Sequence, residues 1–352
     1  MTLQIETPAV LVDLDIARRN VRAFQAYADK HGIRVRPHIK THKLPQMAEL
    51  QLEAGAIGIT CQKVSEAEAM IDGSNRIKDV LITYNILGAE KLARLEKLNE
   101  RVVLSVVADN TIVIDGLSAR FAHTERPLTV LVECNTGADR CGVATPAEAA
   151  DLARRVVDAP GLRFGGLMTY PPVGAAARVQ SFMSEAKRLI EADGLEVPSI
   201  TSGGTPSMME AADAPIATEY RPGTYIYNDR SLVARGVARW DDCALTVLAT
   251  VVSVSAKNRA IIDAGSKVLT SDLLGLAGYG HVLGRDDIRI DQLSEEHGRL
   301  VSDEAIDLVV GQQVRIVPNH ACVVTNMVDA VHILEGGTPR EKWAVAARGR
   351  VL

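Results

Sequence analysis

The sequence predicts a (β/α)8 TIM barrel followed by a C-terminal β domain. Between about residues 8 and 232, short β-branched runs alternate with amphipathic stretches of helical periodicity, the pattern of parallel strands joined by helical crossovers. Beyond about Val233, apolar and polar residues alternate and helical periodicity nearly disappears. We therefore expect a barrel over residues 8–232 and a β domain over residues 233–352.

The first region contains eight predicted strands. They cover residues 34–36, 57–60, 80–83, 102–107, 129–133, 164–169, 199–200 and 217–220. The helices expected between them include residues 15–31, 44–53, 64–71, 89–99, 146–157 and 176–192. Pro45 and Pro146 lie in the first turn of two of these helices, where proline is tolerated. In such a barrel, catalytic groups lie at the carboxyl ends of the strands.

The second region contains strands at residues 244–252, 259–263, 313–317 and 329–334. A further strand at residues 9–12 precedes the first barrel helix. This N-terminal segment, residues 1–14, is an additional candidate for the β domain, although its pairing partner does not follow from the sequence alone.

Composition limits the function classes. With 352 residues, of which 47% are apolar and 24% charged, the chain is long enough to bury a large core. The net charge of -5 and the lack of a long basic cluster argue against nucleic acid as a main partner. Because we find neither a signal-like N-terminus nor a long uninterrupted apolar stretch, we expect a cytoplasmic protein with no membrane partner. The five scattered cysteines argue against a disulfide framework.

The segment Arg36-Pro37-His38-Ile39-Lys40-Thr41-His42-Lys43 follows the first barrel strand. It places Lys40 at a strand end, where a lysine can face a ligand. A lysine removed from water and close to other cations loses its proton more readily, and a neutral amine is what a Schiff base with a carbonyl cofactor requires. The alternative is a solvated basic turn, which is the commoner origin of such charge runs.

A glycine-rich segment, Ser202-Gly203-Gly204-Thr205-Pro206-Ser207, follows the seventh strand. Phosphate sites in TIM barrels are commonly built from this loop and the next one. The two glycines allow close approach of the backbone, and Pro206 can open a short helix whose first amides bind an anion. Such a turn alone is more often a plain loop. Together with Lys40, however, it suggests pyridoxal 5'-phosphate, a phosphorylated aldehyde.

Seven motifs occur in one order along the chain: RPHIKTHK, CQKVSEAEAM, NTGADRCGV, TSGGTPS, RPGTYIYND, DAGSKVLTSD and PNHACVVTN. With them the chain resembles, over nearly its whole length, the family of D-threonine aldolases and D-serine dehydratases. These are pyridoxal-phosphate enzymes with an alanine racemase-like fold. The resemblance implies that the barrel carries the cofactor, that the β domain carries a divalent metal, and that the protein is a homodimer.

The resemblance also implies roles for individual residues. Lys40 corresponds to the Schiff-base lysine, and Arg140 to an arginine near the cofactor's phenolic oxygen, where a fixed cation favours the deprotonated form. The other implied cofactor-binding residues are Gln62, Tyr170, Ser202, Gly203, Gly204, Thr205 and Tyr225. Core or barrel-mouth packing is the alternative role for both tyrosines.

His320 and Cys322 correspond to the metal-binding pair of the family. In an extended segment, residues two apart point to the same face, so that an imidazole and a thiolate can bind one ion. Taken by itself, such a pair is more often structural. Two protein ligands leave positions for water and for the β-hydroxyl of the substrate.

Two departures from the family pattern bear on the chemistry. Aldolase members typically carry His-x-Asp where this chain has His-x-Cys, and a thiolate favours zinc whereas a carboxylate accepts manganese or magnesium. In many members a histidine also follows the position of Tyr170, but here Pro171 follows. The base for the β-hydroxyl would then be metal-bound hydroxide or one of His42, His281 and His297.

We expect a lyase that cleaves D-β-hydroxy-α-amino acids, with D-threonine aldolase favoured by the segments DAGSKVLTSD and MTYPP. The alternative is a D-serine or D-3-hydroxy amino acid dehydratase, which the Cys322 ligand favours. A racemase would need a second base and no metal pair. A non-catalytic carrier of pyridoxal phosphate would need only the barrel, so the β domain argues against it.

Overall fold

The computed structural model describes residues 4–352, and the contacts between residues divide them into two units. The barrel unit comprises residues 22–40, 45–223 and 350–352, and the β unit comprises the described residues up to 21 together with 41–44 and 224–349. The division therefore falls after residue 223 rather than after the expected residue 232. The reason is that this segment bonds within the β unit: Arg230 N donates to Pro318 O (3.1 Å) and Ala244 N donates to Tyr227 O (2.7 Å).

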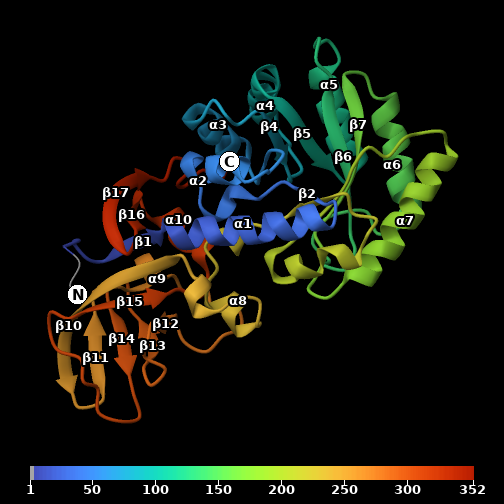
Figure 1. Cartoon of the computed structure of the whole chain (residues 1–352). Helices are drawn as coiled ribbons and strands as arrows, with labels where there is room; N and C mark the ends of the chain where they lie inside the picture. Colours follow the sequence, from blue (N-terminus) through green and yellow to red (C-terminus); the bar gives the residue numbers. More distant parts are fainter. Residues whose placement is uncertain (1–3) are drawn as a thin grey trace. The chain divides into compact units, whose positions relative to one another are not determined.

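A sheet of eight parallel strands forms the centre of the barrel unit within the described residues (Figure 1). The strands are β2 (Arg34–Val35), β3 (Ile59–Cys61), β4 (Asp79–Ile82), β5 (Val103–Ala108), β6 (Leu128–Cys134), β7 (Leu162–Thr169), β8 (Ile200–Gly203) and β9 (Glu219–Arg221). Their order is β2-β9-β8-β7-β6-β5-β4-β3. A parallel bridge between His38 and Thr60 joins the two ends of this path. The predicted barrel is thus confirmed, and each of these eight strands overlaps its predicted segment, β8 by the single residue Ile200.

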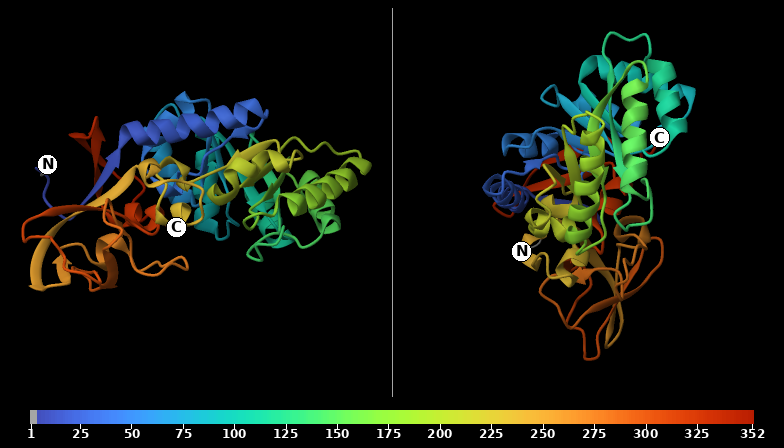
Figure 2. Two further views of the ribbon diagram at one scale, coloured as in Figure 1. Left: turned by 60° about the horizontal axis from the view of Figure 1, so that its bottom comes forward. Right: turned by 90° about the vertical axis from the view of Figure 1, so that its right-hand side faces the viewer.

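Helices cover the outside of this sheet (Figures 1 and 2). They are α2 (Pro45–Glu53), α3 (Val64–Gly73), α4 (Ala89–Arg101), α5 (Thr111–Phe121), α6 (Pro146–Asp158) and α7 (Ala176–Ala192), while α1 (Leu14–Lys30) contributes its later residues. Side-chain caps fix two of the starts. Asn110 Oδ1 accepts from Val113 N (3.0 Å), and Thr145 and Glu148 form a reciprocal capping box. Helix α5 was not among the helices that we predicted.

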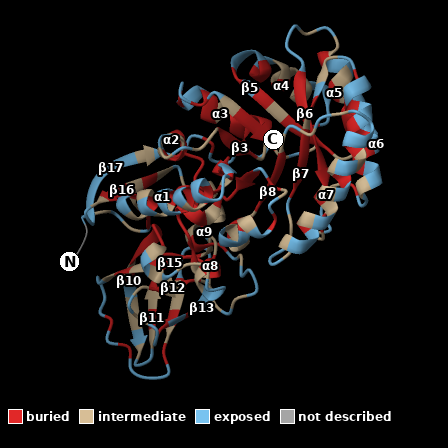
Figure 3. Ribbon diagram, turned by 45° about the vertical axis from the view of Figure 1, so that its right-hand side comes forward, coloured by how far each residue is buried: buried red, intermediate tan, exposed pale blue. Residues whose placement is uncertain are grey.

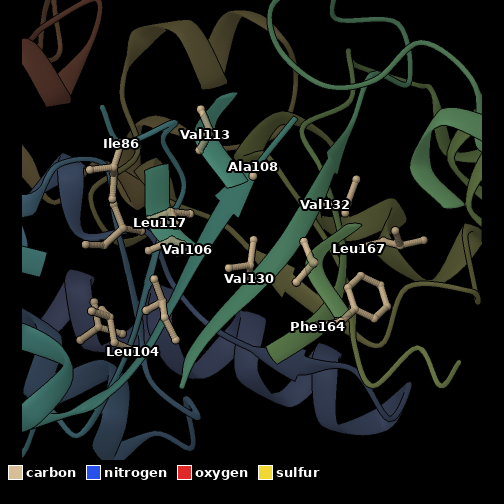
Figure 4. Close-up of a cluster of buried hydrophobic side chains, with 14 of the residues drawn as sticks. Ile86, Leu104, Val106, Ala108, Val113, Leu117, Val130, Val132, Phe164 and Leu167 are labelled. Carbon is tan, nitrogen blue, oxygen red and sulfur yellow. The ribbon is translucent and has the colours of Figure 1, made fainter. Parts of the chain in front are cut away.

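The two faces of the sheet have separate apolar clusters. Figure 4 shows the outer cluster, to which Val106 of β5, Val130 of β6 and Leu117 of α5 belong. The inner face carries a smaller cluster: Leu81, Val107, Leu131 and Met168. Figure 3 shows the strands as largely buried and the helices as exposed on their outer surfaces. Since side chains alternate along a strand, Glu133 lies on the inner face together with Leu131.

The β unit is built around a nine-stranded sheet. Its strands are β1 (Ala9–Asp13), β10 (Leu245–Ala256), β11 (Arg259–Ile262), β12 (His281–Val282), β13 (Arg289–Leu293), β14 (Gly298–Val301), β15 (Gln313–Val317), β16 (Ala330–Glu335) and β17 (Thr338–Ala344). The N-terminal strand β1 joins this sheet, pairing antiparallel with β10 and parallel with β16. The unit also contains the short helices α8 (Arg230–Ala234), α9 (Ser266–Leu269) and α10 (Ala321–Met327).

None of the helices within residues 4–352 is both long enough and apolar enough to span a membrane.

Candidate functional site

Lys40 lies in a single turn of 3-10 helix, η1 (Ile39–Thr41), which is separated from the end of β2 by three residues, and its side chain is half-buried. A chain of hydrogen bonds fixes the backbone at this position. The amide of Lys40 donates to Nδ1 of His38 (3.3 Å), and Nε2 of His38 lies 3.1 Å from Oε1 of Gln62. Gln62 in turn donates from Nε2 to the carbonyl of Thr83 (2.9 Å). The predicted residues Lys40 and Gln62 are therefore linked through His38.

His38 was not among the predicted site residues. Its position in the motif RPHIKTHK is the only sequence signal for it, and its partner Gln62 lies in a different motif. Because Nδ1 accepts a hydrogen bond, Nε2 carries the proton that faces Gln62. Both ends of the Gln62 amide bond to the protein, and its link to Lys40 runs through His38 to the backbone amide of Lys40.

Lys43 is held by contacts within the β unit. Its side chain is buried, and Nζ donates to Oδ1 of Asn326 (2.8 Å) and to the carbonyl of Ala347 (3.3 Å). These contacts give Lys43 a structural role. Of the two lysines in the motif, Lys40 is therefore the one that is suited to bind a ligand.

Arg140 lies on the loop after β6, which folds back so that Val143 forms a bridge with Cys134. Asn135 organises the loop, since its Oδ1 accepts from the amides of Gly137 (2.9 Å) and Asp139 (3.2 Å). The Arg140 guanidinium lies 4.6 Å from the centroid of the Tyr170 ring, which follows β7. Two predicted cofactor-binding residues are thus brought together in a cation–π contact.

The predicted phosphate loop begins in β8, whose last two residues are Ser202 and Gly203, and leads through Gly204 into the 3-10 helix η2 (Thr205–Asp213). Gly204 has a φ of 126°, which only glycine adopts readily. A Cβ at Gly203 would lie 2.8 Å from the carbonyl oxygen of Arg221, so the close approach of β8 and β9 requires glycine there as well. Ser202 and Thr205 are buried on either side of the two glycines.

Neighbouring segments fix the shape of this loop. Oγ1 of Thr205 accepts from the amide of Gly223 (3.1 Å), and Oη of Tyr220 donates to the carbonyl of Gly204 (2.8 Å). A Cβ at Gly204 would lie 3.7 Å from Cε2 of Tyr170. The loop therefore has a rigid backbone, and its two glycines leave that backbone uncovered by side chains. It lies next to Tyr170 and at the start of the helix η2. This arrangement fits a phosphate group.

Glu133 and Arg221 are buried charged residues of the barrel interior that we did not predict as site residues. Arg221 donates to Oγ1 of Thr201 (2.6 Å) and to the carbonyl of Thr169 (2.8 Å), and burial lowers its pKa to about 10. Burial also raises the pKa of Glu133 to about 7, although the nearby Arg140 and Arg221 lower it. The sequence signal for Glu133 is that it is the one charged residue in the run LTVLVEC.

His320 and Cys322 lie at the start of α10, His320 as its N-cap and Cys322 as its second residue. Our prediction of an extended segment was therefore wrong, because the chain enters a helix directly after His320. The two side chains nevertheless interact. Burial lowers the pKa of His320, but the Cys322 thiolate and the hydrogen-bonded Asp229 carboxylate outweigh burial and raise it to about 10.

Three further side chains of the β unit surround this pair. Oδ2 of Asp229 lies 2.9 Å from Nδ1 of His320, and the hydroxyls of Thr41 and Thr224 lie 3.1 Å and 3.8 Å from Sγ of Cys322. Within residues 4–352, no three His, Cys, Asp or Glu side chains converge in a way that would hold an ion. A metal at His320 and Cys322 would thus have two protein ligands, which fits an ion that keeps open positions.

Tyr225 also belongs to the β unit and is buried in the 3-10 helix η3 (Thr224–Ile226).

The three candidate base histidines have different surroundings. His42 is fully buried, with Nδ1 accepting from Leu44 N (3.1 Å). His281 stacks on Trp240 with ring centroids 3.9 Å apart, and burial lowers its pKa. His297 is exposed in the turn between β13 and β14.

Comparison with known proteins connects this geometry with characterised enzymes. The family model of the alanine racemase N-terminal domain matches residues 12–231, and that of a serine dehydratase domain matches residues 244–334. The chain is 33% identical to a D-threonine aldolase of Arthrobacter sp. (98% of this chain and 93% of the relative). It is 34% identical to a 3-hydroxy-D-aspartate aldolase of Paracoccus denitrificans, over 99% of this chain and 93% of the relative. It is 30% identical to a D-threo-3-hydroxyaspartate dehydratase of Delftia sp., over 97% of each chain.

Solved structures give the same picture. The crystal structure of a D-threonine aldolase from Filomicrobium marinum superposes with a TM-score of 0.92 at 34% identity, covering 99% of this chain and 97% of that one. A D-threo-3-hydroxyaspartate dehydratase variant in which a cysteine is replaced by alanine, described as the metal-free form, superposes with a TM-score of 0.88 at 29% identity, covering 97% of each chain. A histidine-to-alanine variant of the same enzyme changes a position two residues earlier.

Proposed function

We propose that this chain, which belongs to the family of D-threonine aldolases, 3-hydroxy-D-aspartate aldolases and D-threo-3-hydroxyaspartate dehydratases, is a D-threonine aldolase that uses pyridoxal phosphate. The reaction breaks the Cα–Cβ bond of a D-β-hydroxy-α-amino acid. The hydroxyl loses its proton as the β-carbon becomes an aldehyde, and the α-carbon takes up a proton to give glycine. The observation that carries the proposal is the similarity, over nearly the whole chain, to two aldolases at 33% and 34% identity.

The barrel unit supplies the residues that would hold the cofactor. Lys40 provides the amine that bonds it, and the backbone at Gly204 and Thr205 receives its phosphate. Arg140 supplies a cation whose orientation is restricted by its contact with the Tyr170 ring. When bound, pyridoxal phosphate accepts the electron pair left on the α-carbon.

The β unit supplies the residues that would hold a divalent ion. His320 contributes Nε2, because its Nδ1 faces Asp229, and Cys322 contributes its thiolate. A bound ion supplies Lewis-acid chemistry at the β-hydroxyl. A soft thiolate with an imidazole favours zinc over manganese or magnesium. Full burial of His42 disfavours it as the base for the hydroxyl proton.

Dehydration is the second candidate function, and it too rests on a specific observation. The spacing of His320 and Cys322 equals the spacing of the two positions replaced in the dehydratase variants, one of which is described as metal-free. In this reaction the α-carbon loses its proton and the β-carbon loses hydroxide. The resulting enamine is hydrolysed to an oxo acid and ammonia.

Metal removal and restoration test the proposed function. We expect chelation to abolish the consumption of D-threonine without bleaching the cofactor, and added zinc or manganese to restore it. L-Threonine should not be consumed under either condition. Full activity after thorough metal removal, or equal consumption of both enantiomers, would contradict the proposal.

The resemblance is also our basis for proposing a homodimer. Sedimentation equilibrium of the cofactor-loaded protein should give twice the chain mass, and a monomer at micromolar concentration would contradict this proposal.

A further inference from the structure

Asp229 is a fully buried carboxylate whose two oxygens are both occupied. Oδ1 accepts hydrogen bonds from Oγ of Ser231 (2.6 Å) and from the amide of Leu232 (3.2 Å). Oδ2 accepts from the amide of Ala321 (3.1 Å) and lies 2.9 Å from Nδ1 of His320. One carboxylate thus joins the starts of two short helices, α8 and α10.

The contact with His320 determines where the imidazole carries its hydrogen. An ionised carboxylate only accepts hydrogen bonds, so the contact requires a hydrogen on Nδ1 of His320. In the neutral ring the lone pair is then on Nε2. Asp229 itself has no free lone pair for a metal, since four donors already surround its two oxygens.

Capping of α8 does not explain this arrangement. An N-cap needs one acceptor for the amide two or three residues later, and serine or asparagine would serve as well as aspartate. The second oxygen faces away from α8 and contacts His320 and Ala321 instead. A carboxylate behind the imidazole is the usual partner of a metal-binding histidine, and its removal typically costs tenfold to a hundredfold in metal affinity.

We propose that Asp229 is a positioning residue that holds His320 with Nε2 available to a metal ion. The inference rests on the proposed function of His320 and Cys322 as the metal pair, and it adds a third residue, Asp229, to the metal site without making it a ligand. It predicts that metal affinity depends on the oxygen of residue 229 that faces His320, and not on the oxygen that caps α8.

Two substitutions separate these roles. Asp229→Asn and Asp229→Ser both retain an acceptor for the Leu232 amide, but neither provides a carboxylate for His320. Ser231→Ala is the matched control, because it removes a hydrogen bond to Oδ1 and leaves the contact between Oδ2 and His320 intact. Each variant is purified with its cofactor and treated with a chelator.

Cobalt titration provides a readout that does not depend on turnover. Co²⁺ bound by Cys322 gives a thiolate-to-metal charge-transfer band, whose growth measures affinity, and competition with a chromophoric chelator gives the zinc affinity. We expect Asp229→Asn and Asp229→Ser to weaken both affinities by tenfold to a hundredfold. Ser231→Ala should change them by less than about threefold. The metal-free Asp229 variants should remain folded at the assay temperature, although their unfolding temperatures fall because the Ala321 amide loses its acceptor.

The possible failures are distinguishable. If wild type shows the band but both Asp229 variants bind as tightly, the role of Asp229 is overturned while the metal pair stands. If Ser231→Ala weakens metal affinity as much as the Asp229 variants do, Asp229 serves the fold and the positioning role is overturned. The same conclusion follows if both Asp229 variants are unfolded without metal. Absence of the band in wild type would reject the metal pair and this inference with it.

Discussion

The hydroxyl of Thr41 lies 3.1 Å from Sγ of Cys322, although the two residues are 281 positions apart in the sequence. Thr41 is fully buried and directly follows Lys40 in the chain. The predicted cofactor lysine is therefore joined by one peptide bond to a residue that contacts a predicted metal ligand. A hydroxyl that donates to a thiolate lowers the electron density on sulfur and tunes the ion that the sulfur binds.

Thr41→Val tests this contact, because valine has nearly the same shape but no hydroxyl. We expect the cobalt charge-transfer band to move to longer wavelength, since a thiolate without its donor gives up an electron more easily. Metal affinity should change by less than about tenfold, which is the smallest loss that is typical when a residue contacting a metal ligand is replaced. An unchanged band would mean that the Thr41 hydroxyl does not donate to the thiolate.

Lys40 and Lys43 can be distinguished by substitution. We expect Lys40→Ala to abolish the visible absorbance of the lysine-bound cofactor and to reduce activity by several orders of magnitude. Lys43→Ala should retain this absorbance but lower the unfolding temperature, because it removes the contacts with Asn326 and Ala347. Loss of the absorbance in Lys43→Ala, with retention in Lys40→Ala, would reverse our assignment.

Arg140→Lys keeps a positive charge but loses the planar guanidinium that stacks on Tyr170. We expect activity to fall by about an order of magnitude or more, with a shift in the cofactor absorbance. The unfolding temperature should hardly change, since Arg140 lies on an exposed loop. Steady-state kinetics and thermal unfolding of the same preparation provide the check, and a large loss of stability would favour a structural role.

Glu133 predicts a pH dependence of stability. Burial raises its pKa to about 7 from a usual value of 4.5, so the folded chain holds a proton that the unfolded chain has released between these values. The free energy of unfolding therefore falls as pH rises through this window. Relative to wild type, Glu133→Gln should gain roughly 2 kcal/mol between about pH 5.5 and pH 8.

Thermal or denaturant unfolding of both proteins across this pH range measures the difference. Parallel pH profiles for wild type and Glu133→Gln would contradict the raised pKa.

Local patterns in the sequence were sufficient to predict the barrel strands, because buried parallel strands appear as short β-branched runs. They were also sufficient for the strand-end positions of Lys40 and Gly204. Helix α5 escaped prediction because its segment, TIVIDGLSARF, contains a glycine and has only a weak amphipathic pattern. At Cys322 the prediction of an extended segment was wrong, although the buried Ala321, Val324 and Thr325 have helical spacing.

The remaining features depend on contacts between distant residues. Asp229 and His320 are 91 positions apart, and no local pattern relates them. Glu133 has an unusual pKa only because closure of the sheet buries it among Arg140, Arg221 and Asp109. Such partners become visible only once the chain is folded.

Product analysis with D-threonine tests the central claim most directly. The cofactor-loaded protein, supplied with zinc or manganese, is incubated with D-threonine, and all four possible products are quantified in one sample. The retro-aldol reaction predicts glycine and acetaldehyde in equal amounts, with neither product formed by Lys40→Ala. Formation of 2-oxobutanoate and ammonia instead would contradict the aldolase assignment and establish the dehydratase.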